Sequence, residues 1–180
     1  MQAAGGADDP PLRILGLTRD PAYDTPPVLK AYAERVDLRT LGARVVGELR
    51  ALHDLPIALD CPGAPPTVHG DPRLLLQALT NLLTNACRNS RGNTVTLRIQ
   101  QQTATVLISV DDRGIGMNRQ RRARVFEPYH TGSPEIGVGL GMMITREIVR
   151  MHGGRLHIQS TPNAGTTMMF ALPILTTEEP

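Results

Sequence analysis

Aromatic residues are scarce in this sequence, which has no tryptophan, two phenylalanines and three tyrosines among 180 residues. A hydrophobic core must therefore be aliphatic, and an apolar content of 41% is enough to build one. Lysine is scarcer still, since Lys30 stands alone and arginine supplies the other cations. The net charge is only +2, so the composition gives no electrostatic reason to expect nucleic acid as a partner.

Cysteines and long apolar runs are also few. Cys61 and Cys87 lack the spacing of a metal site, and we expect reduced thiols in a reducing compartment. No apolar run approaches the roughly 20 residues of a membrane span, and no signal sequence opens the chain. These absences predict a cytoplasmic protein, or the cytoplasmic part of a membrane-anchored sensor, with no direct membrane contact in this segment.

Apolar periodicity and turn residues predict one domain at residues 36–175, between an N-terminal tail or linker at 1–35 and a C-terminal tail at 176–180. Asp71 and Pro72 are typical of a helix start. The expected helices cover 36–52, 71–89, 118–126 and 140–152. The expected strands cover 57–60, 93–101, 103–112, 155–160 and 165–172, and residues 61–70 are expected to form a proline-rich loop and an edge strand. We predict an α/β fold, a two-layer sandwich with a mixed sheet and about three helices on one face.

A glycine cluster, IGVGLGMMITREIV at 136–149, opens the last helix and suggests a phosphate cradle. Two well-known cradles are excluded. A dinucleotide fingerprint needs a strand leading into the glycines, whereas PYHTGSPEI precedes them. A P-loop needs Lys and Ser or Thr after its last glycine, whereas Met142 and Met143 follow Gly141. A helix start after a hinge remains an alternative reading.

The helix at 71–89 carries a polar face, formed by Gln77, Asn81, Asn85 and Arg88 at spacings of 4, 4 and 3 residues. Asparagine is a poor helix former, so two on one face favour a function. Their amide oxygens could hold Mg²⁺ while substrate phosphates complete its coordination, and Arg88 could reach those phosphates. A solvated helix face is the alternative.

Two further stretches carry candidate binding residues. In SVDDRGIGM (109–117), Asp112 ends a strand and could accept a hydrogen bond from an exocyclic amine of a flat ligand such as adenine; Asp111 is a rival for this role. Gly114 and Gly116 would let the backbone approach that ligand. In VFEPYHTG (125–132), the aromatic pair Phe126 and Tyr129 could anchor a lid.

Four motifs in this order, NLLTNA (81–86), DRGIG (112–116), FEPY (126–129) and GVGLGM (137–142), resemble the N, G1, F and G2 boxes of bacterial sensor histidine kinases. The resemblance is to their ATP-binding catalytic domain, of the GHKL or Bergerat-fold superfamily, and covers about residues 36–174. It implies ATP and Mg²⁺ as cofactors and a mobile lid at about 118–136. The implied metal ligands are Asn81 and Asn85, and the implied nucleotide-binding residues are these two with Arg88, Asp112, Gly114, Gly116, Phe126, Tyr129, Gly137, Val138, Gly139, Leu140 and Gly141.

The resemblance also implies a reaction. ATP-hydrolysing members of the superfamily have a glutamate where this chain has Asn81, which is no base, so we expect slow hydrolysis. Asn81, Asn85 and Arg88 would instead support transfer of the γ-phosphoryl group to a histidine. That histidine would belong to a dimerisation domain not present in this chain, for relay to the receiver domain of a response regulator. His53 begins a similar motif but lacks the rest of it.

Two departures from the family pattern concern catalytic strength. Many relatives carry Lys or Arg after the F box, where this chain has His130-Thr131-Gly132-Ser133; His130 or Arg124 could substitute. Asn89 stands where an aromatic residue is common. A degenerate nucleotide-binding or protein-interaction module therefore remains an alternative function. A serine kinase of the anti-sigma type is a third, although those proteins lack a clear F box.

Overall fold

The computed structural model describes residues 33–64, 66–127 and 139–174. Within them, a five-stranded sheet has the order β2-β4-β5-β7-β6 and a separate two-stranded sheet joins β1 to β3. The strands are β1 (Glu34–Asp37), β2 (Ile57–Asp60), β3 (Thr67–Gly70), β4 (Val95–Gln101), β5 (Thr105–Asp112), β6 (Leu156–Thr161) and β7 (Gly165–Pro173). The helices are α2 (Leu38–Arg50), α3 (Pro72–Asn89), α4 (Arg119–Arg124) and α5 (Gly141–Met151).

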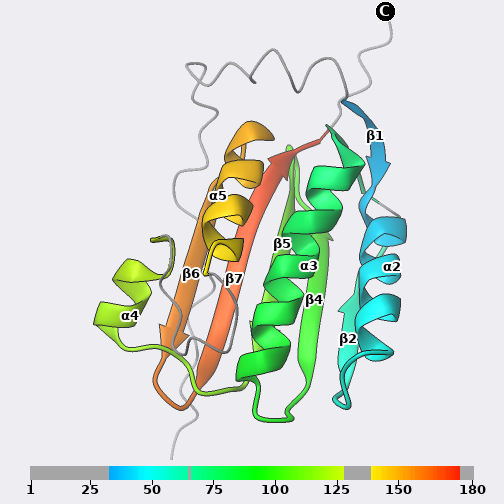
Figure 1. The fold of residues 1–180 in the computed structure, drawn as a ribbon. Coiled ribbons are helices and arrows are strands. Elements are labelled where there is room, and N and C mark those ends of the chain that lie inside the picture. The colour runs from blue at the N-terminus through cyan, green and yellow to red at the C-terminus, as the bar shows by residue number, and fades with distance from the viewer. Residues whose placement is uncertain (1–32, 65, 128–138, 175–180) are drawn as a thin grey trace, which may run out of the picture.

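The large sheet is mixed, as predicted. β2 pairs parallel with β4, whereas the pairs β4–β5, β5–β7 and β6–β7 are antiparallel. Figure 1 shows α2, α3 and α5 side by side on one face of this sheet, with the short α4 beyond its β6 edge. The predicted two-layer sandwich is therefore confirmed, and none of the described helices is long and apolar enough to cross a membrane.

An aliphatic core fills the space between the two layers, as the shortage of aromatic residues requires. Along β5 the side chains alternate strictly, so that Val106, Ile108 and Val110 are buried under the helices. The helices contribute leucines to the same core, and each fully buried leucine stabilises the fold by about 1.5–3 kcal/mol. Phe170 of β7 is the largest side chain fully buried there.

The start of the domain differs from the prediction in two places. Glu34 and Arg35, assigned to the linker from the sequence, belong to β1, which pairs antiparallel with β3. The first helix begins at Leu38 rather than Val36, because the Asp37 side chain accepts a hydrogen bond from the backbone N of Thr40 and caps the helix there. Leu52, the last residue of the helix predicted from the sequence, lies beyond the end of α2 and is 76% exposed.

The other predicted elements are confirmed to within a few residues. Asp71 caps α3 by accepting hydrogen bonds from the backbone N of Arg73 and Leu74, at 2.8 and 3.3 Å.

The start of α3 is also joined to the end of α5, because the Asp71 backbone N donates to Nε2 of buried His152 at 3.1 Å. Nδ1 of His152 donates to the Ile148 carbonyl at 2.7 Å, so the imidazole is neutral. Burial lowers the pKa of His152.

Candidate functional site

The polar face predicted on α3 is present in the structure. Asn81 and Asn85 are half-buried, and Gln77 and Arg88 are exposed. On the opposite side of α3, the side chains are buried against the sheet and α2. These residues are Leu75, Ala78, Leu79, Leu82, Leu83, Ala86 and Cys87. Leu74, in the first turn of α3, is half-buried. The two asparagines therefore stand at the margin between the core and the surface.

Asn81 faces the first turn of α5. Its Nδ2 donates to the carbonyl oxygen of Gly141 and to Oγ1 of Thr145, both at 3.3 Å. A Cβ at Gly141 would stand 3.6 Å from Cγ of Asn81, an ordinary van der Waals contact, so the packing of α5 against Asn81 does not itself require glycine here. The structure thus brings together residues from the first and fourth predicted motifs, which are 60 positions apart in the chain.

The α5 N-terminus has no capping side chain. Leu140 is the N-cap residue and offers no side-chain hydrogen bond, and the first turn contains no acidic residue. Gly139, just before it, has a φ of +70°, which suits glycine. The backbone N–H groups of a first helical turn form an anion-binding position when no side chain caps them. Gly137 and Val138, the other predicted residues of this motif, lie outside the described residues.

Asn89, the last residue of α3, is held against Asn85. Its Nδ2 donates to the Asn85 carbonyl at 2.7 Å and to Asn85 Oδ1 at 3.3 Å. Its own carbonyl oxygen accepts a hydrogen bond from the backbone N of Ile115 at 3.0 Å. In the sequence, Asn89 is a departure from the family pattern with no predicted role. Here it joins the amide pair of α3 to the glycine loop after β5.

Asp112 and Asp111 lie on opposite faces of the sheet, because neighbouring residues of a strand point in opposite directions. Asp112 is 7% exposed on the helix-covered face, and its Oδ1 accepts a hydrogen bond from the Gly114 backbone N at 2.9 Å. Asp111 lies on the open face, where it pairs with Arg98 at 2.8 Å and accepts from Thr167 Oγ1 at 2.6 Å. Asp112 is thus the carboxylate on the side of α3 and α5.

The carboxyl group of Asp112 is poorly solvated. Burial raises its pKa above the ordinary aspartate value, and the nearby charge of Asp111 raises it further. Backbone N–H groups of Gly114 and Thr166 oppose this rise by stabilising the charged form. The hydrogen bonds offset only part of the cost of burying this carboxylate, so Asp112 lowers the stability of the fold. Residues that lower stability in this way are common at binding sites.

Gly114 and Gly116 are required by the protein's own packing. A Cβ at Gly114 would stand 1.7 Å from the carbonyl oxygen of Asn89, and one at Gly116 would stand 1.9 Å from that of Thr161. Gly116 also has a φ of +59°. The sequence pattern predicts that both glycines allow the backbone to approach a ligand. The structure gives a different reason, the close contact of the loop with α3 and with the β6–β7 turn.

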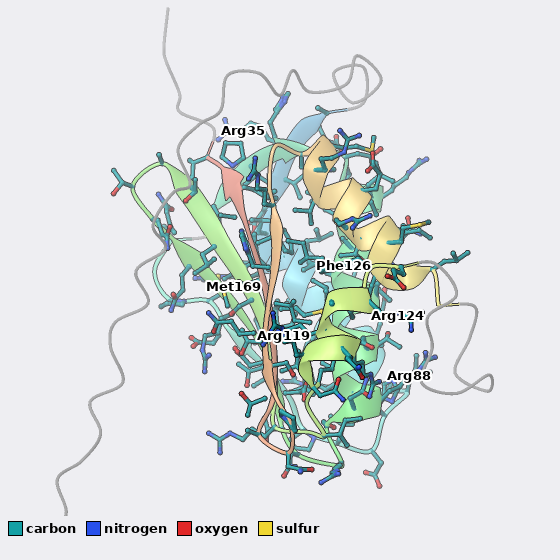
Figure 2. The ribbon with its side chains drawn as sticks, turned by 90° about the vertical axis from the view of Figure 1, so that its left-hand side faces the viewer. Arg35, Arg88, Arg119, Arg124, Phe126 and Met169 are labelled. Carbon is teal, nitrogen blue, oxygen red and sulfur yellow. The ribbon has the colours of Figure 1, made fainter. Side chains whose placement is uncertain are left out.

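Phe126 packs near α5. The guanidinium of Arg146, a residue of α5, stands 5.5 Å from the centre of the Phe126 ring, within range of a cation–π interaction. The basic helix α4 precedes it, with arginine at four of six positions and Asn118 as its cap. Figure 2 views the molecule from the β6 edge of the sheet. It shows Phe126, Arg124 and Arg88 on the face that the helices cover, whereas Met169 lies on the opposite face. Tyr129 and His130 fall outside the described residues.

Comparisons with known proteins identify the family. Residues 70–176 match the family of histidine kinase-, DNA gyrase B- and HSP90-like ATPases. The adaptive-response sensory kinase SasA of Parasynechococcus marenigrum (strain WH8102) is 34% identical over 150 residues, which is 78% of this chain and 39% of SasA. The chain therefore spans about two fifths of the length of that relative.

Solved structures show the same fold. The mycobacterial sensor histidine kinase MprB has a TM-score of 0.71 and 30% identity, over 79% of this chain and 97% of the MprB chain. Full-length ShkA, crystallised with AMPPNP, has a TM-score of 0.73 and 26% identity, over 81% of this chain and 32% of ShkA. With the family match and the mixed sheet described above, this chain belongs to the histidine kinase-, DNA gyrase B- and HSP90-like ATPases, as the ATPase domain of a sensor histidine kinase.

Proposed function

We propose that this domain binds Mg-ATP between α3, the start of α5 and the loop after β5, and transfers the γ-phosphoryl group to a histidine outside this chain. The acceptor histidine would lie on a dimerisation domain, and the phosphoryl group would pass on to the receiver domain of a response regulator. This reaction uses cytoplasmic ATP, and we place the domain in that compartment. The observation that carries the proposal is the approach of Asn81 on α3 to the uncapped first turn of α5.

The chemistry of these groups fits a metal-bound triphosphate. Asn81 and Asn85 offer neutral amide oxygens one helical turn apart, the hard oxygen ligands that Mg²⁺ accepts. Within the described residues, no group of three or more His, Cys, Asp or Glu could hold a metal by itself. Phosphate oxygens would therefore supply the remaining charge, with the α5 N-terminus and Arg88 opposite them. When bound, Mg²⁺ would neutralise charge on the transferring phosphoryl group.

Asp112 would recognise the base of the nucleotide. Its carboxylate lies on the helix-covered face of the sheet at the end of β5, fixed by the hydrogen bond from Gly114. A fixed acceptor of this kind suits the exocyclic amine of adenine and would disfavour guanine, which presents a carbonyl oxygen at the corresponding position. Gly139, Leu140 and Gly141 would close on the phosphates, together with Gly137 and Val138.

The same residues disfavour hydrolysis. An amide at position 81 cannot accept a proton from water at neutral pH, so no base is supplied there. Of the histidines that the structure describes, His152 is buried with both ring nitrogens hydrogen-bonded, and His53 lies in the α2–β2 loop on the far side of α3 from α5 (Figure 1). The other two described histidines, His69 on β3 and His157 on β6, are exposed on strands and lie on neither α3 nor α5. None of the four is suited to accept the phosphoryl group. The nucleophile would therefore come from another segment or chain.

Calorimetric titration with AMPPNP, with Mg²⁺ and then with EDTA, tests nucleotide binding. The proposal predicts tighter binding with Mg²⁺. Phosphotransfer is then followed from γ-labelled ATP to the dimerisation domain of the same kinase supplied in trans. We expect label on the acceptor histidine and little phosphate release without the acceptor. Fast ATP hydrolysis by the domain alone would contradict the role of Asn81, and Mg²⁺-independent or absent binding would favour the binding-module alternative.

A further inference from the structure

Thr145 is a fully buried polar residue beside Asn81, and it belongs to none of the four sequence motifs. It lies one turn into α5, where its Oγ1 donates to the Gly141 carbonyl at 2.8 Å. The same oxygen accepts a hydrogen bond from Nδ2 of Asn81 at 3.3 Å. A threonine hydroxyl often bonds back to the carbonyl four residues earlier in its helix. The second hydrogen bond of Thr145 is less usual, because its donor is a side chain of another helix, α3.

The three hydrogen bonds define which way the Asn81 amide faces. The Gly141 carbonyl can only accept, so both the Thr145 hydroxyl and the Asn81 nitrogen must donate to it. Because the Thr145 proton is committed to that carbonyl, its lone pair is what faces Asn81. Rotating the amide by half a turn would set Oδ1 of Asn81 against the Gly141 carbonyl, two acceptors in contact, at the cost of at least one buried hydrogen bond.

We propose that Thr145 is a positioning residue, which fixes the side-chain amide of Asn81 with its nitrogen toward α5 and its oxygen available to the metal-bound nucleotide. The inference rests on the proposed function of the site. Outer partners of this kind orient metal ligands in many sites, and losing one typically lowers metal affinity by about 10–100-fold. The buried position of Thr145, between α3 and α5, makes the orientation permanent rather than induced by the ligand.

The test compares Thr145→Val with Thr145→Ser. Valine keeps the branched shape and removes the hydroxyl, whereas serine keeps the hydroxyl. AMPPNP affinity is measured by calorimetry with Mg²⁺ and with EDTA, and thermal unfolding checks the fold of each variant. We expect Thr145→Val to weaken binding about tenfold with Mg²⁺ and to change it little with EDTA. Thr145→Ser should stay close to wild type. Equal losses in both conditions, or no loss, would overturn the inference.

A second readout separates this inference from the proposed function. If the wild-type domain showed no Mg²⁺-dependent binding, the proposed function would fail, but the orientation of Asn81 would still be measurable by NMR. The Nδ2 proton signals of Asn81, assigned by their absence from Asn81→Ser, should be protected from solvent exchange in wild type and in Thr145→Ser. They should lose that protection in Thr145→Val. Unchanged protection in Thr145→Val would refute the positioning role.

Discussion

The carbonyl oxygen of Asn89, at the end of α3, accepts a hydrogen bond from the backbone N of Ile115 at 3.0 Å. This contact joins the helix that carries Asn81 and Asn85 to the loop that follows Asp112. The proposed metal-binding and base-binding halves of the site are thereby held as one unit. Gly114 makes this approach possible, since any side chain there would meet the Asn89 carbonyl.

Gly114→Ala should destabilise the domain by at least about 1–3 kcal/mol, because its Cβ would overlap the Asn89 carbonyl and the loop would have to move. Gly47→Ala is the matched control, since Gly47 lies in α2 with nothing within 4 Å of an added Cβ. That change should stabilise by about 0.5–1 kcal/mol. Urea unfolding of the two variants measures both effects. Equal stability of the two would show that the loop does not require glycine at 114.

Asn85→Ala should weaken AMPPNP binding in Mg²⁺ by about tenfold or more, because a side-chain oxygen that faces a charged partner contributes roughly 1.5–3 kcal/mol. The fold should be kept, because Asn89 bonds mainly to the backbone carbonyl of residue 85, at 2.7 Å. Gln77→Ala, an exposed change two turns earlier on the same helix, serves as the control and should bind as wild type does. Calorimetry that finds the two variants equal would remove Asn85 from the site.

Asp112→Asn should weaken ATP binding by about tenfold while leaving the domain as stable or more stable at neutral pH. Burial raises the pKa of Asp112, so its contribution to stability is complete below the ordinary aspartate pKa and is lost as pH rises through the folded value. The advantage of the variant should therefore be present at neutral pH and vanish in acid. Thermal unfolding against pH measures it, and a variant destabilised at neutral pH would contradict this account.

Stability should also fall when His152 becomes protonated. Burial lowers the pKa of His152, so the stability that its neutral form provides is present above the ordinary histidine pKa and is lost as pH falls through the folded value. Protonation would remove the acceptor for the Asp71 backbone N and so release the end of α5 from the start of α3. Urea unfolding between about pH 7.5 and pH 5 should show this decline in wild type.

His157→Gln is the control for that titration, because His157 is exposed on β6. It should keep the pH dependence of wild type, whereas His152→Gln should be less stable at pH 7.5 and largely lose the dependence. If the two variants had the same pH profile, the decline would have to come from other groups.

Much of this molecule could be predicted from local patterns in the sequence. Asp71 and Pro72 give the start of α3, apolar periodicity and turn residues give the strands β4 and β5, and four ordered motifs give the family. Each of these signals is local, since a capping residue or an apolar period acts within a few residues. β1 was missed because a four-residue edge strand has too short a pattern, and its partner β3 is more than 25 residues away.

Tertiary structure decided what no local pattern contains. Asn81 meets Gly141 and Thr145 because α3 and α5 pack antiparallel on the same sheet, and Asn89 meets Gly114 because β5 ends beside the end of α3. The structure therefore gives Thr145 and Asn89 roles that the sequence did not suggest. It also explains glycine at positions 114 and 116 by close packing within the protein rather than by the predicted approach of a ligand. The sequence by itself determined the elements other than β1, the family and the two amides on one helix face. Only packing, which joins residues far apart in the chain, decided which groups orient the amides of Asn81 and Asn85.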